Sequence, residues 1–590
     1  MKKLELVRAF EDVTVESNID LTVEMNKREV EKDVYEYEFF LNWDAEQAKE
    51  DGSKVAMHWF LPLVDVQYMW HPATRPRRVL DGNWRLKIES KLTYSAPIGV
   101  LFNSADMNTY TFATDEVKKE TSVTCGTYDH EDAMHAEISM GLKQFVNQNS
   151  DRLLVRADFR KIPYYEVIDD VRKWWEDVLD LEPMPVPDVA RMPVYSSWYN
   201  FHQDIKDTEL EAECVRAKEL GMDAIIVDDG WQCENNGGGY GYTGDWEPYE
   251  GKIANMKEDV KRVHEAGLKY ILWYSVPYVG YFSKNWERFK DKVIYTVDRS
   301  NAGVLDPRYP EVRQFLIDTY VNAMKEFDLD GFKLDFVDRF KLLGDAEMKP
   351  GMDFACVQEA TDRMMTDIML NLKAIKEDIM IEFRQSYIGP AMRRFGNMFR
   401  VGDCASDIAS NRIGTIDLRL TSGNTSVHAD MLTWNNAETT EDAALQILNV
   451  MFGVIQFSKI IEELTPDHRE MVAFWLKFAR ENEKVLQESK LIPYEPHFLY
   501  PVVKAYDEKE EIIAVYAMNK ILHPDLAKEK IQVINASKEA AVYLKVEQDT
   551  EAKILTRDCK GHVTNEETVS WKKGVVQVSV PRSGLLEITK

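Results

Sequence analysis

Three patterns of hydrophobic and polar positions follow one another along the chain. In roughly the first 165 residues, short β-branched and aromatic runs alternate with polar residues between turn signals, at residues 55–70, 84–103 and 152–160. This period-two alternation is typical of antiparallel strands with one buried face, and it predicts an N-terminal β-sandwich. Residues 164–180 instead have helical spacing, and the four prolines within residues 182–193 indicate a linker.

From Pro193 onward, short apolar runs alternate with helical segments. Buried parallel strands read as nearly continuous apolar runs, so eight such units predict a central (β/α)8 barrel, with a doubly wound sheet as the alternative. The runs lie at residues 193–198, 223–229, 269–275, 331–336, 378–384, 398–403, 426–434 and 452–458, and the helical patterns at 207–221, 253–269, 308–327, 355–376 and 465–483.

After residue 487 the chain returns to short alternating runs, which predict a small C-terminal β-sandwich. The expected fold is therefore α/β, with a central barrel between two β-domains. We expect an N-terminal sandwich plus linker helix at residues 1–180, a catalytic barrel at 181–487 and an antiparallel β-domain at 488–590. The runs that predict the last domain lie at residues 497–506, 511–518, 540–546, 575–580 and 584–590.

The charge of the chain narrows the choice of partners. Its 73 Lys and Arg residues face 101 Asp and Glu residues, a formal net charge of −28 at pH 7. So acidic a chain repels phosphate backbones and anionic lipid, which argues against nucleic-acid and membrane partners. The basic cluster of Arg75, Arg77 and Arg78 is short, and we expect a solvated loop there. No run of about 18 apolar residues is present, so we expect no membrane span.

The six cysteines are widely scattered and form no CxxC or CxxH pair, so neither a zinc site nor a redox dithiol is expected. We predict no metal and no other cofactor. Sparse cysteine fits a reducing compartment, and charged residues interrupt any apolar signal region near the N-terminus. These observations predict a cytoplasmic, soluble protein. A homo-oligomer is compatible with the sequence, which does not fix the number of subunits.

Polar and aromatic residues gather where the predicted barrel strands end. In a (β/α)8 barrel, these carboxyl ends converge on one face. Paired carboxylates between aromatic walls are suited to cleaving a glycosidic bond, although solvated loops and metal sites also use such residues. The candidates are Trp198 at the end of the first run, Asp228 and Asp229 at the end of the second with Trp231 beyond it, Trp273 in the third, Lys333 and Asp335 in the fourth, Glu382 and Arg384 in the fifth, and Arg400, Asp403 and Asp407 in or after the sixth.

Two pairs of charged residues have both a functional and a structural interpretation. Strand alternation puts Lys333 and Asp335 on the same side, where the ammonium would hold the carboxylate ionised, as a nucleophile requires; a structural pair is the alternative. The carboxylates of Asp228 and Asp229 would repel each other without a partner. Two sugar hydroxyls would be suitable partners, although a helix cap followed by a turn would also explain the two residues.

Two further side chains are candidates for contacting a ligand. Gly230 would allow a tight turn that swings Trp231 over the face of a sugar. His428 lies on the expected seventh strand, where it would either bind a distal hydroxyl or be a satisfied core histidine.

Four segments taken together resemble glycoside hydrolase family 36, the family of bacterial α-galactosidases and plant raffinose-type enzymes. The resemblance covers residues 193 to about 487, and the DDGW and KLDF motifs in register make it specific. The order of sandwich, barrel and small sandwich also agrees. The segments are PVYSSWYNF (193–201), GMDAIIVDDGWQ (221–232), GDWEPYEGKIANMKEDVKRVHEAGLKYILW (244–273) and DGFKLDFVD (330–338).

The resemblance implies a role for each matched position. Asp335 would be the nucleophile, with Lys333 beside it on the substrate. Asp228 and Asp229 would hold the axial and primary hydroxyls of a galacto-configured sugar. Arg400 is expected to face a sugar hydroxyl or another carboxylate. The other expected substrate contacts are Trp198, Trp231 and Trp273, which would shape the pocket, together with Arg384, Asp403 and His428.

The acid/base is implied less directly, because the sequence departs from the family pattern here. One pattern places it four residues after an arginine, where this chain has Cys404. Asp407, preceded by serine and followed by Arg412, resembles the Ser-Asp pair of bacterial members better than Asp403 does. We therefore expect Asp407 to be the acid/base and Asp403 a substrate contact. A general acid at neutral pH needs a raised pKa, which burial or the charge of Asp403 would give to Asp407.

The implied reaction is a double displacement with retention, carried out by two carboxyl groups about 5–5.5 Å apart. The favoured function is an exo-α-galactosidase that acts on terminal α-D-galactosyl residues of oligosaccharides. The alternatives are α-galactosyl transfer, another α-glycosidase such as an α-N-acetylgalactosaminidase, and a non-catalytic sugar-binding protein. The sequence also departs from the family pattern at residues 382–397 and 276–277, in loops expected to contact the substrate. These departures leave the identity of the sugar more open than the class of reaction.

Overall fold

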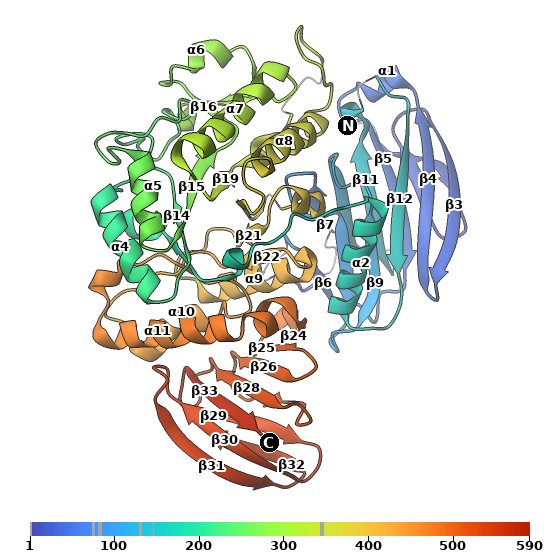
Figure 1. The fold of residues 1–590 in the computed structure, drawn as a ribbon. Coiled ribbons are helices and arrows are strands. Elements are labelled where there is room, and N and C mark those ends of the chain that lie inside the picture. The colour runs from blue at the N-terminus through green and yellow to red at the C-terminus, as the bar shows by residue number, and fades with distance from the viewer. Residues whose placement is uncertain are drawn as a thin grey trace.

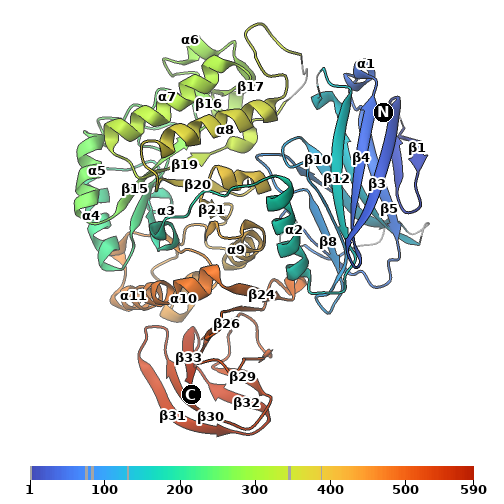
Figure 2. The same cartoon turned by 45° about the vertical axis from the view of Figure 1, so that its right-hand side comes forward.

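The chain folds into three units, which Figures 1 and 2 show from two sides. A β-sandwich (blue) flanks a central barrel (green to orange), and a smaller β-domain (red) packs below the barrel helices. This arrangement confirms the predicted α/β fold, with a central barrel between two β-domains. The structure is a computed structural model, and it describes residues 3–73, 77–80, 85–128, 132–145, 147–342, 347–386 and 388–590.

The N-terminal unit is a sandwich of two six-stranded sheets. Its core forms because alternate residues of the strands point inward, as with Tyr37 and Trp59, whose buried rings meet edge to face. The first sheet contains, in order, β1 (Glu5–Ala9), β2 (Thr14–Ser17), β5 (Lys54–Leu61), β11 (Ala133–Gly141), β10 (Thr121–Tyr128) and β7 (Arg85–Ser90), and the second contains β3 (Leu21–Glu31), β4 (Val34–Trp43), β12 (Ser150–Asp158), β9 (Asn108–Thr114), β8 (Ile98–Phe102) and β6 (Tyr68–Trp70), with a short α1 (Ala45–Ala48) after β4.

Helix α2 (Tyr164–Val178) lies between the sandwich and the barrel, as Figure 2 shows. Its apolar stripe is buried, and Trp175 Nε1 donates a hydrogen bond of 2.9 Å to the Thr114 carbonyl of β9. On the other side, the Tyr164 hydroxyl donates to the Pro493 carbonyl at 2.7 Å. The predicted helix therefore joins the sandwich to the units that follow it.

Eight parallel strands form the central sheet, and an isolated parallel bridge between His428 and Val454 nearly closes it into a barrel. Each of the eight predicted apolar runs contains one of these strands, so the predicted barrel is confirmed. In sheet order, the strands are β22 (Ser426–His428), β21 (Met398–Arg400), β20 (Met380–Arg384), β19 (Gly331–Asp335), β15 (Lys269–Ser275), β14 (Ala224–Val227), β13 (Val194–Ser196) and β23 (Gln456–Phe457).

Helices surround this sheet, and two of those longer than four residues have no counterpart in the sequence prediction. Helix α9 (Ile408–Ser422) has no clear apolar stripe because it is covered on several sides, with Arg412, Thr415 and Asp417 all buried. Within the described residues, no helix is long and apolar enough to span a membrane. The others are α3 (Trp198–Phe201), α4 (Asp207–Glu219), α5 (Met256–Glu265), α7 (Pro310–Phe327), α8 (Val357–Lys373), α11 (Pro466–Glu481) and the second unpredicted helix, α10 (Thr440–Leu448).

A small antiparallel sheet follows β15, where the sequence pattern predicts no strands. It contains β16 (Tyr278–Gly280), β18 (Ala302–Leu305) and β17 (Val293–Val297), with α6 (Trp286–Phe289) in a connection. Gly280 packs against the loop that follows β14, because a Cβ at this position would lie only 2.1 Å from the Gly241 carbonyl oxygen. The sheet therefore anchors that loop over the carboxyl end of the barrel.

The C-terminal unit pairs a seven-stranded sheet with a three-stranded one. The predicted strand at residues 497–506 begins only at Val502, because residues 496–498 form a 3₁₀ turn. The large sheet contains β24 (Lys490–Tyr494), β25 (Val502–Tyr506), β26 (Glu510–Val515), β28 (Lys530–Asn535), β33 (Gly584–Thr589), β30 (Thr550–Arg557) and β31 (Val563–Trp571), and the small one contains β27 (Ile521–Leu522), β29 (Ala541–Val546) and β32 (Gly574–Ser579).

One buried carboxylate joins all three units. Asp417, on α9, accepts hydrogen bonds from Arg78 Nη2 at 2.8 Å to both oxygens, from Trp70 Nε1 at 3.0 Å and from the Tyr500 hydroxyl at 2.5 Å. Trp70 and Arg78 belong to the sandwich, and Tyr500 belongs to the C-terminal unit. The prediction of a solvated loop is wrong for Arg78, which is buried because Asp417 neutralises it; Arg75 lies outside the described residues.

Candidate active site

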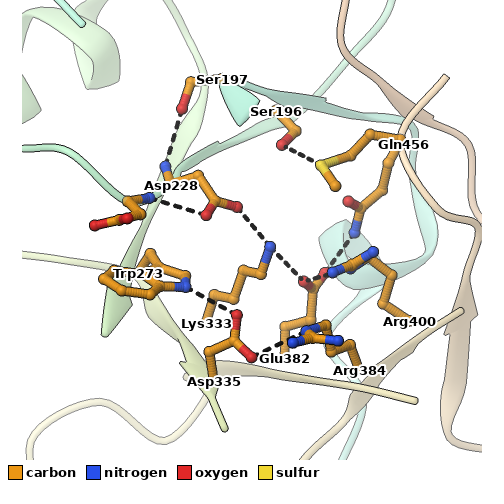
Figure 3. A network of polar contacts seen from close by, with 12 residues as sticks. Ser196, Ser197, Asp228, Trp273, Lys333, Asp335, Glu382, Arg384, Arg400 and Gln456 are labelled. Atoms are coloured by element: carbon orange, nitrogen blue, oxygen red, sulfur yellow. Dashed lines mark hydrogen bonds and ion pairs between the residues drawn. The ribbon is translucent and has the colours of Figure 1, made fainter. Parts of the chain in front are cut away.

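A network of charged side chains crosses the carboxyl end of the barrel, as Figure 3 shows. Cations and carboxylates alternate along it, so each charge has an opposite charge beside it. The structure thus brings together strand-end residues that the sequence rule places on one face. They are Asp228 after β14, Lys333 and Asp335 of β19, Glu382 and Arg384 of β20, and Arg400 of β21.

The carboxylate of Asp335 is held by donors at both oxygens. Oδ1 accepts from the Phe336 backbone N–H at 2.8 Å and from Arg384 Nε at 2.9 Å, and Oδ2 accepts from Trp273 Nε1 at 3.1 Å. Asp335 is buried, and Phe336 has a φ of 65°, so the chain turns sharply directly after the carboxylate. These contacts fix the orientation of Asp335, and the adjacent guanidinium stabilises its ionised form.

Lys333 has a different partner from the one predicted. Its ammonium donates to Asp228 Oδ2 at 2.5 Å and lies 4.0 Å from Glu382 Oε1, and both contacts are buried. Strand alternation correctly puts Lys333 and Asp335 on one side, but the long lysine chain reaches β14. Arg384 is a cation that does contact Asp335.

Glu382 is a buried carboxylate in the interior of the barrel. Burial raises its pKa, although the nearby charges of Lys333 and Arg400 oppose this shift. Gln456 of β23 donates to its Oε2, and Arg400 Nε lies 3.6 Å from its Oε1. Glu382 therefore connects the cations of β19 and β21 across the sheet.

His428 is a satisfied core residue, so its predicted role as a substrate contact is wrong. It is fully buried, with Nε2 2.8 Å from the Ala190 carbonyl and Nδ1 3.1 Å from Gln456 Nε2. Burial lowers the pKa of His428 to about 3, so the ring is neutral. Because a carbonyl can only accept, the ring proton is on Nε2, and Nδ1 accepts from Gln456.

Asp229 is enclosed by amides of the protein rather than turned toward a ligand. Oδ1 accepts from Gln232 Nε2 at 2.7 Å, and Oδ2 accepts from Gln203 Nε2 at 2.8 Å and from Asn236 Nδ2 at 3.1 Å. Burial raises the pKa of Asp229, and these amides oppose the shift. The expectation that adjacent carboxylates need sugar hydroxyls as partners is therefore wrong, because Lys333 neutralises Asp228 and amides satisfy Asp229.

The turn after Asp229 depends on glycine, but it does not place Trp231 over a ligand. Gly230 has a φ of 116°, and a Cβ there would lie 2.7 Å from Gln203 Cα. Trp231 is fully buried, and its Nε1 donates to the Trp273 carbonyl at 2.9 Å. Trp231 therefore holds the backbone of Trp273 in place through this hydrogen bond. Trp198 is half-buried and lies two residues after the end of β13.

Arg400 faces carboxylates, in line with its sequence prediction. Nη1 donates to Asp430 Oδ1 at 2.5 Å, and Nη2 donates to Asp403 Oδ1 at 3.0 Å. Asp430 is buried and also accepts from the Tyr199 hydroxyl at 2.9 Å and from the Cys404 N–H at 2.7 Å. Asp430 thus fixes both Arg400 and the start of the segment that follows Asp403.

Asp403 is linked to Asp335 through one guanidinium. Its Oδ2 lies 3.7 Å from Arg384 Nη1, and its side chain is 54% exposed. Partial burial acts to raise the pKa of Asp403, but the positive charges of Arg400, Arg384 and Lys333 outweigh it and hold the pKa well below its usual range. Asp403 is therefore an accessible, ionised carboxylate beside the candidate nucleophile.

Asp407 is the N-cap of α9, and its expected raised pKa is wrong. Its Oδ1 accepts from the backbone N–H groups of Ala409 at 3.1 Å and Ser410 at 3.0 Å, and its Oδ2 accepts from the Ser410 hydroxyl at 2.6 Å. Partial burial acts to raise its pKa, but these hydrogen bonds lower it. Asp407 is exposed and serves to begin the helix.

Aromatic rings form one wall beside Asp335. Tyr240, in the loop after β14, stacks on Tyr278 with ring centroids 5.0 Å apart and on Trp273 at 6.3 Å. It meets Phe336 edge-on at 5.0 Å. Burial raises the pKa of Tyr240, and the charge of Asp335 adds to the shift, so the phenol lies within the electrostatic field of that carboxylate.

The Melibiase family model matches residues 188–489, just over half of the 590-residue chain, and this range contains every residue of the site. The chain belongs to the Melibiase family. The sequence-based resemblance to α-galactosidases of glycoside hydrolase family 36 is confirmed at the level of the family.

Curated relatives of this melibiase-family chain match over a shorter range. An α-galactosidase of Lactobacillus acidophilus is 27% identical over 157 residues, which are 25% of this chain and 21% of the relative. An α-galactosidase of Pediococcus pentosaceus is 28% identical over 151 residues, which are 24% of this chain and 20% of the relative. The matches thus span about a fifth of the length of these relatives.

Solved structures match over nearly the whole chain. An α-galactosidase AgaA variant from Geobacillus stearothermophilus, in complex with raffinose, has a TM-score of 0.66 at 15% identity and covers 99% of this chain and 84% of its own. An α-galactosidase from Lactobacillus brevis has a TM-score of 0.65 at 13% identity, covering 100% of this chain and 83% of its own. At such identities the likeness shows a shared fold.

The rule that functional residues of a barrel lie at the carboxyl ends of its strands misses part of the site of this melibiase-family chain. It names Glu382 without a role and omits Gln456 and Tyr240. A polar residue inside an otherwise apolar barrel strand is the signal that marks Gln456. No strand-end signal points to Tyr240, because it lies in a long loop whose path depends on its packing against β16.

Proposed function

We propose that this chain is a retaining exo-α-glycosidase that hydrolyses terminal α-D-galactosyl residues of oligosaccharides. The observation that carries the proposal is a pair of carboxylates joined by one guanidinium: Arg384 contacts Asp335 through Nε and Asp403 through Nη1. Two carboxylates beside a glycosidic bond are what this hydrolysis requires. Relatives named as α-galactosidases, and a similar structure in complex with raffinose, favour α-galactosides.

Asp335 is the proposed nucleophile. In the first step, an Asp335 oxygen forms a bond to the anomeric carbon while the glycosidic C–O bond breaks and leaves its electron pair on the departing oxygen. In the second step, water attacks the same carbon and the ester bond to Asp335 breaks. Two inversions at one carbon give net retention.

Asp403 is the proposed acid/base, in place of Asp407. It lies three residues after the end of β21, in a βα loop where barrel enzymes position catalytic groups, and its side chain is accessible. It would give a proton to the departing oxygen and later take one from the incoming water. Asp407 is occupied with capping α9, and among the described residues it forms no hydrogen bond or ion pair with the network around Asp335.

The protonation of Asp403 gives the proposed reaction a pH dependence. Arg400 and Arg384 keep its pKa low in the ligand-free protein, so the acid is protonated only under acidic conditions. A sugar hydroxyl that accepts a hydrogen bond from Arg384 would draw the guanidinium away from Asp403 and raise that pKa. We expect an acidic optimum for substrates whose leaving group is another sugar.

The filled interior of the barrel favours recognition of the terminal sugar of an oligosaccharide. Asp228 and Lys333 lie side by side, so one hydroxyl could donate to the carboxylate and accept from the ammonium. Glu382, Arg400 and Gln456 are buried in the same network and fill the interior. This filled interior supports binding of a terminal sugar rather than passage of a chain.

A panel of 4-nitrophenyl glycosides tests the proposal. We expect release of nitrophenol from the α-D-galactoside and a loss of about 10⁴-fold or more in Asp335→Ala, because the nucleophile is removed. Asp328→Asn is the matched control, because Asp328 is exposed near the amino end of the same strand. The first-formed anomer, observed by proton NMR, should be the α anomer.

Other outcomes would identify the alternatives. Turnover of a different α-glycoside would keep the mechanism and change the sugar. Transfer of galactose to an acceptor sugar in place of water would make the chain a transferase. Sugar binding without turnover of any glycoside would refute the hydrolase and leave a binding protein.

We also propose a cytoplasmic location. Its support is that all six cysteines are free thiols, which fits a reducing compartment. Fractionation of cells of the source organism, followed by immunodetection, tests this, and recovery outside the cytoplasm would refute it.

A further inference from the structure

A cleft lies between the N-terminal sandwich and the segment that follows the nucleophile strand. This sandwich cleft has a volume of about 620 Å³. One wall is formed by the ends of strands β5, β7, β10 and β11 of the first sandwich sheet with their loops, and the other is the segment after β19. Its lining includes Lys91, Tyr94, Glu120, Thr121, Asp338 and Lys341.

The barrel wall of the sandwich cleft begins at the nucleophile. Asp335 ends β19, and Asp338 follows three residues later in a 3₁₀ turn. Burial raises the pKa of Asp338, Arg339 and Arg384 lower it, and the charge of Asp335 raises it. Asp338 therefore belongs to the same segment as Asp335, and the sandwich cleft, which Asp338 lines, begins three residues after the candidate nucleophile.

The sandwich holds this wall in place. The buried ammonium of Lys91 donates to the carbonyls of Asp338 at 3.1 Å and Phe340 at 3.2 Å. On the barrel side, the Tyr295 hydroxyl donates to the Arg339 carbonyl at 2.9 Å. Both walls are thus fixed relative to each other, so the sandwich cleft is a pre-formed cavity at a domain junction, where ligand sites are common.

The lining of the sandwich cleft is rich in hydroxyls and balanced in charge. The hydroxyls of Ser90 and Thr121 lie 2.9 Å apart, and the ring of Tyr94 stands between this cleft and a neighbouring cavity, because it lines both. A balanced lining does not select a charged ligand, and hydroxyls with an aromatic face suit a neutral sugar. The charged lining residues are Lys54, Lys87, Lys91 and Lys341 against Glu89, Glu120 and Asp338.

We propose that the sandwich cleft binds the sugar units on the leaving side of the cleaved bond. The proposal rests on the proposed function and adds to it that the N-terminal sandwich selects the substrate. A volume of about 620 Å³ lies within the range of small-ligand sites, which fits one or two sugar units. Lys341 and Tyr94, on opposite walls, would contact the leaving sugar.

The test compares substrates that share galactose and differ in the leaving group. We would measure kcat/KM for 4-nitrophenyl α-D-galactoside, raffinose and stachyose with the wild type and with Tyr94→Ala and Lys341→Ala. Lys161→Ala is the matched control, because Lys161 is exposed on the sandwich and does not line the cleft. Thermal unfolding of each variant checks that the fold is intact.

We expect the ratio of kcat/KM for stachyose to that for the aryl galactoside to fall about tenfold in both cleft variants and to stay unchanged in the control. An unchanged ratio in folded Tyr94→Ala and Lys341→Ala would overturn the inference while leaving the α-galactosidase activity in place. No turnover of the aryl galactoside by the wild type would instead overturn the proposed function, and the inference with it.

Discussion

Replacing Asp403 and Asp407 one at a time should separate catalysis from helix capping. Removal of a general acid costs typically about 10²–10⁴-fold in rate. We therefore expect Asp403→Ala to lose that factor in kcat/KM for raffinose. The loss on 4-nitrophenyl α-D-galactoside should be much smaller, because nitrophenolate leaves without protonation. Stability should change little, since the ion pairs of Asp403 are partly exposed and such pairs are worth about 0–1 kcal/mol.

Asp407→Ala should have the opposite signature. Its carboxylate satisfies the N–H groups of Ala409 and Ser410 at the first turn of α9, and loss of such a cap costs about 1 kcal/mol, within a range of 0.5–2. The urea midpoint should fall accordingly, while kcat/KM for raffinose at 25 °C should stay within about twofold of the wild type.

Asparagine supplies a matched pair of controls. Asn caps helices about as well as Asp, so Asp407→Asn should restore the stability lost in Asp407→Ala. Asparagine cannot transfer the proton, so Asp403→Asn should remain as defective on raffinose as Asp403→Ala. A hundredfold loss of activity in Asp407→Asn, with Asp403→Asn active, would refute the assignment and return the acid/base role to Asp407.

Two further predictions concern the guanidinium groups. Arg384→Gln removes one of the charges that lower the pKa of Asp403, so the acid should stay protonated to higher pH, and the alkaline limb of the pH profile of kcat/KM for raffinose should move upward; a limb that does not move would contradict the link between the two residues. Asp417→Asn leaves Arg78 buried without its counter-ion and should cost about 3–5 kcal/mol, measured as a lower urea midpoint, whereas a cost below about 1 kcal/mol would show that water reaches Arg78.

The barrel could be predicted from the sequence because its strands are buried on both faces. Residues 269–275 form β15 with the same limits as the predicted run, since a continuous apolar segment has few other stable environments. Helix α9 could not be predicted in this way, because its neighbours cover it on several sides. Without the helix, Asp407 has no cap to form, although an Asp immediately before an apolar residue is a usable signal for the start of a helix.

The site was predictable to the level of strand ends but not of partners. Alternation correctly groups Lys333 with Asp335, yet rotamers decide that Lys333 reaches Asp228 and that Arg384 reaches Asp335. Similarly, the chain position of Asp229 suggests a ligand contact, and only the path of the following loop brings Asn236 to it. The sequence pattern therefore predicts where a side chain lies along a strand, whereas its partner depends on contacts between segments that are far apart in the sequence.

The buried junction at Asp417 has a consequence for the order in which the chain is made. Arg78 and Asp417 are separated by 339 residues, so at ribosomal speeds of about 5–20 residues per second the arginine waits roughly 20–70 s for its counter-ion. Tyr500 is added another 83 residues later. During that interval Arg78 of the newly made sandwich must stay hydrated. The surface around Trp70 and Arg78 can be buried only when α9 of the barrel has been synthesised. This surface of the nascent sandwich is therefore exposed during synthesis, and a chaperone could bind it before the three units pack together.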